Sequence, residues 1–383
     1  MEGSIGRGVS HISGQSTTTE DMGPHDSLSL AEWGHLTVNQ PLRVAVAGTG
    51  AFGRNHLRIY DELPGVTLAA AIEPNAERAG EVAAQYGIPV FASTGEALSA
   101  DLKLDAASVA VPTVFHHAVA GELLAAGVDC LVEKPIAATL AEADDLIALA
   151  GKHGRILQPG HLERFNPAVL AIEPKLTRPM FFEAHRLSVF TPRSLDVDVV
   201  LDLMIHDLDI VLTFANSPVR EVRAVGLPIL SAKVDIANVR VEFESGCVAN
   251  FTASRVSTER VRKLRFFEPR QYVSIDYARR DVLVIAVDEG FSVEQAMAAG
   301  AAEGFKDGLP GLSFSKPEVT PGEPLRLEIA SFLNAVRNRT APQVTARQGR
   351  EALALALEIQ RQMEAHADAA GLGDFFSPKH PTN

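Results

Sequence analysis

The stretch VAVAGTGAFGRNH, residues 44–56, decides the fold of the first part of the chain. A run of small apolar residues ends at Ala47, and three glycines follow as Gly48, Gly50 and Gly53. A buried strand, a G-x-G-x-x-G turn and a helix form the arrangement that holds the pyrophosphate of a dinucleotide. The first glycine permits a tight turn, the second lets the backbone approach the phosphates, and the third allows the helix to pack closely.

The residues around this turn indicate which dinucleotide binds. The start of the following helix offers unpaired N–H groups to an anion, so Ala51 and Phe52 are assigned to the cofactor site as well. Glu73 ends the next apolar run, 25 positions after Gly48. A carboxylate there accepts hydrogen bonds from the adenosine ribose and repels a 2′-phosphate, which predicts NAD rather than NADP. A plain glycine-rich turn is the alternative interpretation of the glycines alone.

Apolar runs alternate with helical stretches from this turn onward. The runs cover residues 42–47, 66–72, 88–91, 106–111, 129–132 and 156–158. Fully apolar strands separated by helices are typical of a parallel sheet covered on both faces. Residues 41–165 are therefore predicted to form an α/β domain with a Rossmann-type, doubly wound parallel sheet.

The pattern changes after about residue 165. Strand-like runs then follow one another mostly without helices, which favours an antiparallel sheet. We expect an α+β domain for substrate binding and oligomerisation over residues 166–345, with a large, mostly antiparallel open sheet. A helix is expected at about 201–215, and an irregular excursion at 289–322. Amphipathic stripes predict helices at 325–336 and 348–365, and residues 346–368 are expected to pack back between the domains.

Composition and charge limit the functions that the chain can have. The 383 residues are 46% hydrophobic and 22% charged, as in an ordinary globular protein, and carry a formal net charge of -13. A negative balance of this size argues against nucleic acid as a partner. The two cysteines, Cys130 and Cys247, cannot build a disulfide framework, which favours a reducing cytoplasm.

Neither the termini nor the interior of the chain suggests a membrane protein. No segment approaches the ~18 apolar residues needed to cross a bilayer. Residues 1–40 lack a secretory or twin-arginine signal and are expected to form a disordered leader, and residues 369–383 a tail. We therefore expect a cytoplasmic protein without a membrane segment.

A lysine follows the fifth apolar run, in the sequence Glu133-Lys134-Pro135. Ligands of open α/β sheets bind at the carboxyl ends of the strands, so Lys134 is expected to face the nicotinamide end of the cofactor. A surface lysine before a proline is the alternative.

The second charged cluster is DVVLDLMIHDLDI, residues 198–210. Asp202 and His206 are four residues apart and share one face of the predicted helix. An imidazole titrates near neutrality and suits removal of a hydroxyl proton, with a carboxylate to orient it or to bind substrate. We expect Asp207 and Asp209 to lie on a solvated face or to cap the helix. A zinc site is the alternative, but no third ligand is evident and no metal is predicted.

Together these elements resemble the Gfo/Idh/MocA oxidoreductases. The matching stretches are GTGAFGRNH, VPTVFH (111–116), EKP, the Asp202–His206 helix and the helix after TARQG (345–349), within residues 42–366. The resemblance implies an NAD-dependent dehydrogenase whose catalytic residues are Lys134, Asp202 and His206. It also implies that Pro112, His116 and Glu133 contact the cofactor, and that the open sheet forms a homodimer or homotetramer.

A narrower resemblance concerns GHLERFNPAV (160–169) and EAHRLSVFTPRSLDVDVVLDLMIHDLDI (183–210). These stretches are similar to the branch that includes UDP-N-acetylglucosamine 3-dehydrogenase, which oxidises C3 of its sugar and so prepares a diamino sugar for lipid A. The resemblance implies that this chain, like members of that branch, oxidises a hydroxyl of a nucleotide sugar to a ketone with NAD. Arg164, Arg186 and Arg193 would suit a substrate diphosphate, because guanidinium pairs with phosphate in bidentate fashion. His161 would touch the nicotinamide or the substrate.

Other interpretations of these residues remain open at this point. Arg164 would otherwise pack between the domains, Arg186 and Arg193 would be solvated, and His161 would be a hydrogen-bonded core residue. The alternative functions are a dehydrogenase of a free polyol such as inositol, an NAD-dependent glycosidase, and a non-catalytic NAD-binding regulator.

Overall fold

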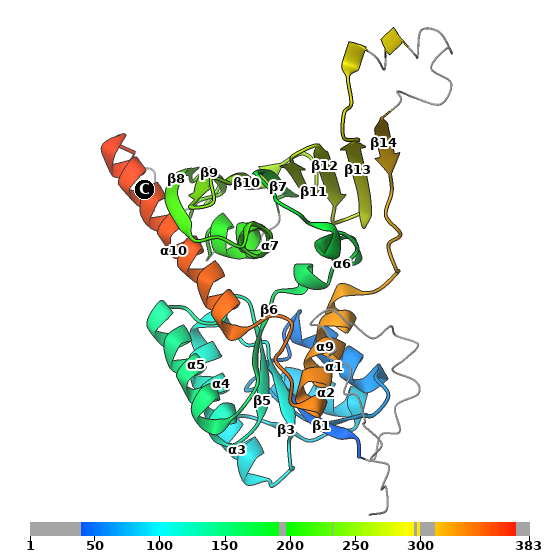
Figure 1. Ribbon diagram of the computed structural model, residues 1–383. Coiled ribbons are helices and arrows are strands. Elements are labelled where there is room, and N and C mark those ends of the chain that lie inside the picture. Colours follow the sequence, from blue (N-terminus) through cyan, green and yellow to red (C-terminus); the bar gives the residue numbers. More distant parts are fainter. Residues whose placement is uncertain (1–39, 191–196, 232, 295–296, 299–310, 373–383) are drawn as a thin grey trace, which may run out of the picture. The chain divides into compact units, whose positions relative to one another are not determined.

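The computed structural model describes residues 40–190, 197–231, 233–294, 297–298 and 311–372. The expected leader up to residue 39, Arg193 and the tail beyond residue 372 lie outside these ranges. Within them the chain forms two sheets, and Figure 1 shows their strands and the helices around them.

The first sheet has six strands in the order β3-β2-β1-β4-β5-β6. All neighbouring strands are parallel. Their bounds are β1 (Leu42–Ala47), β2 (Val66–Ile72), β3 (Val90–Phe91), β4 (Ala106–Val109), β5 (Asp129–Glu133) and β6 (Leu157–Gly160). The strand order reverses between β1 and β4, and ligands of doubly wound sheets bind at this switch point.

Helices cover both faces of this sheet, which explains why its strands are apolar throughout. They are α1 (Gly53–Glu62), α2 (Ala76–Tyr86), α3 (Thr94–Ser99), α4 (His116–Ala125), preceded by the short η2 (Thr113–Phe115), and α5 (Leu140–His153). Helix α5 shows how locally these elements are encoded. Its N-terminus is a capping box of Thr139 and Glu142, and it ends at Gly154 in the left-handed conformation.

The second sheet has eight strands in the order β14-β13-β12-β11-β7-β10-β9-β8. Their bounds are β7 (Phe181–Val189), β8 (Val219–Leu227), β9 (Ile236–Phe243), β10 (Val248–Ser257), β11 (Val261–Glu268), β12 (Gln271–Asp276), β13 (Asp281–Val287) and β14 (Leu312–Ser315). Only β7 and β10 pair in parallel, and the other neighbours are antiparallel. Strand β14 was not expected, because it lies within residues 289–322, which the composition predicts to be irregular.

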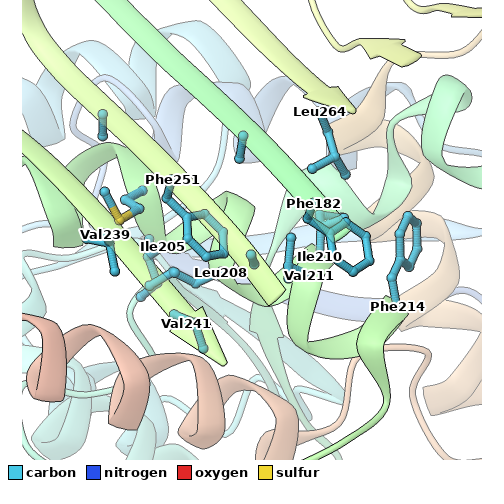
Figure 2. Packing of buried hydrophobic residues seen from close by; sticks show 14 of the residues in the cluster. Phe182, Ile205, Leu208, Ile210, Val211, Phe214, Val239, Val241, Phe251 and Leu264 are labelled. Atoms are coloured by element: carbon cyan, nitrogen blue, oxygen red, sulfur yellow. The ribbon is translucent and has the colours of Figure 1, made fainter. Parts of the chain in front are cut away.

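One face of the second sheet is covered by the helix that carries the second charged cluster. A π-helical turn, η5 (Val200–Met204), leads into α7 (Ile205–Ala215). Figure 2 shows Ile205 and Leu208 of α7 packed close to Phe251 of β10, within one buried cluster. The apolar face of α7 is therefore used for packing, and its polar residues are left for other contacts. Between the sheets in sequence lie η3 (Leu162–Phe165), α6 (Pro167–Ile172) and η4 (Glu173–Lys175).

The last two helices, α9 (Pro324–Asn338) and α10 (Ala346–Ala369), both return to the first sheet. The sequence prediction placed α9 within the second domain, but Ile329 and Phe332 belong to the buried cluster of Val44 and Leu57 in β1 and α1. Helix α10 contacts β8 and α7, and also α5 and β6. The amphipathic stripe of α9 identifies its buried face but does not specify which sheet covers that face.

Candidate active site

The glycine turn after β1 has the geometry that a dinucleotide requires. Gly48 has φ +86°, and a Cβ there would lie 2.6 Å from the carbonyl oxygen of Ala110. A Cβ on Gly53 would overlap the carbonyl oxygen of Gly48. A Cβ on Gly50, by contrast, would meet nothing within 4 Å. Gly48 and Gly53 are thus required by packing, whereas Gly50 leaves open the space into which phosphates fit.

Glu73 is held rigidly beside this turn. Its Oε2 accepts hydrogen bonds from the backbone N and hydroxyl of Thr49, at 3.1 and 2.8 Å. Its Oε1 accepts from the backbone N of Asn75 and from the guanidinium of Arg78, at 2.9 and 2.8 Å. Burial opposes ionisation, but these hydrogen bonds prevail and lower the pKa of Glu73 to about 2. The residues at the switch point therefore fit a dinucleotide, with a carboxylate where a 2′-phosphate would be repelled.

Lys134 connects the end of β5 to the π-helical turn of the second charged cluster. Its Nζ donates to the carbonyl oxygens of Asp202 and Leu201, at 2.6 and 3.4 Å, and lies 4.0 Å from Oδ1 of Asp202. Its side chain is 19% exposed. Burial lowers the pKa of Lys134, and the charges of Asp202 and Glu133 oppose this shift. The two motifs that the sequence singled out, 68 residues apart, thus lie in contact.

The π-helical turn presents these carbonyl groups. Asp198 lies just before this turn, and its Oδ1 accepts hydrogen bonds from the backbone N of Val200 and Leu201, at 2.8 and 3.1 Å. Single π-helical turns within helices are rare and occur frequently at functional sites. The sequence pattern predicts an ordinary α-helix here, because a residue spacing of four does not distinguish the two.

His206 follows this turn on α7 and is 9% exposed. Its Nδ1 has no hydrogen-bond partner among the residues that the structure describes. Burial, followed by the positive charges of Lys134 and Arg186, lowers the pKa of His206 well below 6.5. The imidazole is therefore neutral near pH 7 and can accept a proton. Asp202 lies beside Lys134, and within the described ranges no hydrogen bond joins it to His206.

The other residues predicted to hold the cofactor line the ends of β4 and β5. His116, 1% exposed, bridges two loops, with Nδ1 2.8 Å from the carbonyl oxygen of Pro135 and Nε2 2.9 Å from that of Val111. Pro112 precedes η2, the 3-10 turn that leads into His116. The carboxylate of Glu133 is engaged by His56, whose Nε2 lies 2.9 Å away.

Two of the arginines predicted to bind the diphosphate, Arg186 and Arg164, are bound to other residues of the protein. Arg186 is 3% exposed and donates to both carboxylate oxygens of Asp207, at 2.7 and 2.9 Å, and to Glu163 at 2.9 Å. Arg164, also 3% exposed, donates to Thr213 and Glu173. Guanidinium groups that are neutralised and buried in this way are not free to bind a substrate diphosphate.

The expectation that Asp207 and Asp209 lie on a solvated face is wrong. Both are 2% exposed. Asp207 neutralises Arg186, and Asp209 lies 3.8 Å from Nδ1 of His161 and 3.9 Å from Nη1 of Arg164. The partners of these carboxylates come from β7 and η3, elements that the local pattern of α7 cannot specify. His161 is buried, and neither of its ring nitrogens has a hydrogen-bond partner in the described part of the chain.

One further arginine, which the sequence did not single out, acts electrostatically on the histidine. Arg262 of β11 lies opposite Arg186 of β7 in the antiparallel register. It is two residues before the buried Leu264, so its side chain lies on the same face of the sheet. Arg262 nevertheless is exposed, and its positive charge acts on His206. Arg262 is therefore an exposed residue whose strand position places it on the face of the sheet that α7 covers.

Two buried polar residues were also missed. His56 and Glu328 are both fully buried, and neither carboxylate oxygen of Glu328 has a hydrogen-bond partner among the described residues. Burial, with the nearby charges of Glu133 and Asp209, raises the pKa of Glu328 well above 4.5. A signal was present, since Glu328 is three residues after Leu325 and four before Phe332, on the apolar face of α9.

Two negative findings apply to the described residues. They contain no group of three or more histidine, cysteine, aspartate or glutamate side chains arranged to hold a metal ion. None of the helices formed by these residues combines the length and the apolar character that crossing a membrane requires.

Comparisons with known proteins agree with this geometry. Residues 42–161 match the model of an oxidoreductase family with an NAD-binding Rossmann fold, GFO_IDH_MocA, and residues 174–270 match the C-terminal domain model of the same family. UDP-N-acetylglucosamine 3-dehydrogenase of Acidithiobacillus ferrooxidans is 37% identical over 325 residues, which are 85% of this chain and 98% of the relative. A solved structure of that enzyme covers the same shares, with a TM-score of 0.76 and 35% identity.

A second relative has a different substrate. Inositol 2-dehydrogenase of Leifsonia xyli is 33% identical over 195 residues, which are 49% of this chain and 57% of the relative. The family models, the match to 98% of the Acidithiobacillus ferrooxidans enzyme and the Rossmann-type site all indicate the same family. The chain belongs to the Gfo/Idh/MocA family of NAD-binding oxidoreductases.

Proposed function

We propose that the protein oxidises the C3 hydroxyl of UDP-N-acetylglucosamine to a ketone with NAD. The observation that carries this proposal is the contact of Lys134 with the turn that precedes His206, which brings an ammonium group and a neutral imidazole to one site. The identity of 37% to a UDP-N-acetylglucosamine 3-dehydrogenase, over 98% of that relative, supports the choice of sugar.

The cofactor and the catalytic residues have separate tasks. The turn of Gly48, Gly50 and Gly53 would hold the pyrophosphate, and Glu73 the adenosine ribose. When bound, NAD supplies the hydride acceptor for the sugar carbon. The protein then has to position the reacting hydroxyl and to manage its proton and charge.

The proton and the charge are assigned to different groups. His206, neutral because its pKa is lowered, accepts the proton of the hydroxyl. Lys134 donates a hydrogen bond to the same oxygen and stabilises the negative charge that develops there. Asp202 lies 4.0 Å from Lys134 and holds the ammonium in place. A sensor that only bound NAD would have no use for this set, and this argues against a purely regulatory function.

We assign the substrate diphosphate to Arg262. The guanidinium groups of Arg164 and Arg186 are occupied by protein partners, whereas Arg262 is an exposed residue whose charge acts on His206. Guanidinium suits phosphate oxygens, and a free polyol would give it no partner. The position of Arg262 therefore favours a nucleotide sugar over an inositol-type substrate.

The biological setting follows from this assignment as part of the proposal. A 3-keto sugar is suited to amination, which would place the enzyme before a transaminase that prepares a diamino sugar for lipid A. We also propose a cytoplasmic homodimer or homotetramer formed through the open sheet. Sedimentation at micromolar protein concentration tests the oligomeric state, and a monomer would contradict it.

The test of the function is NADH formation with UDP-N-acetylglucosamine, UDP-glucose and myo-inositol, with NAD and NADP compared. We expect turnover with NAD and UDP-N-acetylglucosamine, and a product lighter by two hydrogen atoms. Turnover with inositol alone would support the polyol dehydrogenase. A changed sugar without accumulation of NADH would indicate the glycosidase, and no turnover with any substrate would favour the regulator.

A further inference from the structure

Four buried polar side chains from α1, β4 and β5 form a hydrogen-bonded chain that ends at Glu133, the residue before Lys134. Tyr60 Oη lies 2.7 Å from Ser108 Oγ, which lies 2.9 Å from Nδ1 of His56, and Nε2 of His56 lies 2.9 Å from Oε1 of Glu133. Tyr60, Ser108 and His56 are fully buried, and Glu133 is 8% exposed. Glu133 directly precedes Lys134, so the chain ends next to the site.

The direction of these hydrogen bonds follows from the chemistry of the groups. A carboxylate only accepts, so Nε2–H of His56 donates to Glu133. In the tautomer with its hydrogen on Nε2, Nδ1 of His56 accepts from the hydroxyl of Ser108, and that oxygen accepts from Tyr60. Every donor has an acceptor in this arrangement, and each bond polarises the next toward Glu133.

A role in packing alone does not explain the chain. Apolar side chains of similar shape would fill this space without the cost of removing four polar groups from water. The groups are instead fully satisfied along a path that ends at a carboxylate beside the lysine.

The carboxylate at the end of the chain affects the lysine directly. Burial lowers the pKa of Lys134, and the charge of Glu133 is one of the two that oppose this effect, together with Asp202. The charge of Glu133 also acts on His116 in α4, on His161 before η3 and on Glu328 in α9. The positive charge of Arg186 acts on Lys134 in the opposite sense and lowers its pKa.

We propose that Tyr60, Ser108 and His56 are positioning residues, which orient the carboxylate of Glu133 and so keep Lys134 charged and directed at the substrate. The effect of these residues on catalysis rests on the proposed function. The effect of Glu133 on the pKa of Lys134 does not, and this pKa can be measured without substrate.

The experiment replaces His56 in two ways. The amide of His56→Gln reaches the position of Nε2 and still donates to Glu133, whereas His56→Asn loses this bond. Lysine residues are labelled by reductive ¹³C-methylation and titrated by NMR, and the Lys134 signal is identified by its absence in Lys134→Arg. We expect the pKa of Lys134 to fall by about 0.5–1 unit in His56→Asn and to stay near the wild-type value in His56→Gln.

A matched control is available on the surface. His117 of α4 also pairs with a carboxylate, Asp145, at 2.7 Å, but its side chain is 37% exposed. His117→Asn should leave the titration of Lys134 unchanged. If His56→Asn does not fold, Ser108→Ala and Tyr60→Phe interrupt the chain one and two bonds further away, and smaller shifts in the same direction are expected.

Activity provides the second measurement. The alkaline limb of kcat/KM should move to lower pH in His56→Asn by the same interval as the Lys134 titration, with recovery in His56→Gln. Folded variants in which Lys134 titrates at the wild-type pH would overturn the proposal. If the enzyme oxidised no UDP-sugar, the proposed function would be wrong, but the NMR titration would still test the positioning role of His56. Failure of the proposed function and failure of this inference are therefore distinguishable.

Discussion

Glu328 provides a direct test of the electrostatics inside the protein. Its carboxyl group is fully buried, has no hydrogen-bond partner among the described residues, and has a pKa raised well above 4.5 by burial and by Glu133 and Asp209. Glu328→Gln replaces it with a neutral group of nearly the same shape. The substitution therefore removes the titration and leaves the packing of α9 in place.

The sign follows from the protons bound in each state. Above pH 4.5 the unfolded chain releases the proton of Glu328, and the folded protein keeps it until its raised pKa is reached. Folding then takes up a proton, so the stabilisation linked to Glu328 is complete below the unfolded pKa and is lost as the pH rises. The free energy of unfolding of the wild type, relative to the variant, should fall by up to about 1.4 kcal/mol per pH unit in this window.

Urea unfolding at pH 5, 6, 7 and 8 measures this difference. Between pH 5 and pH 7 the wild type should lose up to about 2.7 kcal/mol of unfolding free energy relative to Glu328→Gln. Exposed Glu364→Gln on α10 serves as the control and should show no such trend. A wild-type-minus-variant difference that is independent of pH would refute the reasoning, because Glu328 would then ionise as readily in the folded protein as in the unfolded chain.

Three further predictions concern the site. Because the pKa of His206 is lowered, the imidazole becomes protonated, and kcat/KM falls on the acid side, only well below pH 6.5. Because the pKa of Lys134 is also lowered, kcat/KM should fall on the alkaline side at a pH below 10.5, where Lys134 loses its proton. A pH profile whose acid limb lies at or above pH 6.5 would contradict this. Gly50→Ala should weaken NAD binding, measured by calorimetry, about tenfold and leave the free energy of unfolding unchanged. Gly53→Ala should lower the free energy of unfolding, measured by denaturation, by about 1–3 kcal/mol. Equal effects of the two substitutions on NAD binding and on stability would contradict the assignment. Arg186→Ala should cost about 3–5 kcal/mol of stability, whereas Arg262→Gln should raise the Kd for UDP about tenfold and leave stability unchanged; the reverse pattern would return the diphosphate to Arg186.

Much of the first sheet could be predicted from the sequence because its signals are local. Strands that are apolar on both faces stand out against the helices between them, and the observed bounds of β1 and β2 match the apolar runs at 42–47 and 66–72. The glycines are recognisable because their geometry depends on neighbouring backbone. Gly48 faces Ala110, and Gly53 faces Gly48.

Where the prediction failed, the cause was a partner distant in the sequence. Asp207 and Asp209 look like a solvated face until Arg186, Arg164 and His161 are brought against them by β7 and η3. Helix α9 shows a clear apolar stripe, but the stripe does not reveal that it returns to the first sheet.

The arrangement of the candidate active site was predicted only in part. The sequence singled out Lys134 and His206 individually, and the family resemblance joined them. Their spatial relation depends on the π-helical turn, whose carbonyl groups receive the lysine, and residue spacing alone does not encode this turn. Arg262 was missed because an arginine in an alternating strand is usually a solvated residue.

The central claim is that the ammonium of Lys134 and the imidazole of His206 meet at one substrate hydroxyl. A crystal structure of the protein with NADH and UDP-N-acetylglucosamine tests it most directly. We predict the sugar 3-hydroxyl within hydrogen-bond distance of both Lys134 Nζ and a ring nitrogen of His206, with its carbon facing the nicotinamide. A sugar bound with that hydroxyl out of reach of either side chain would contradict the account.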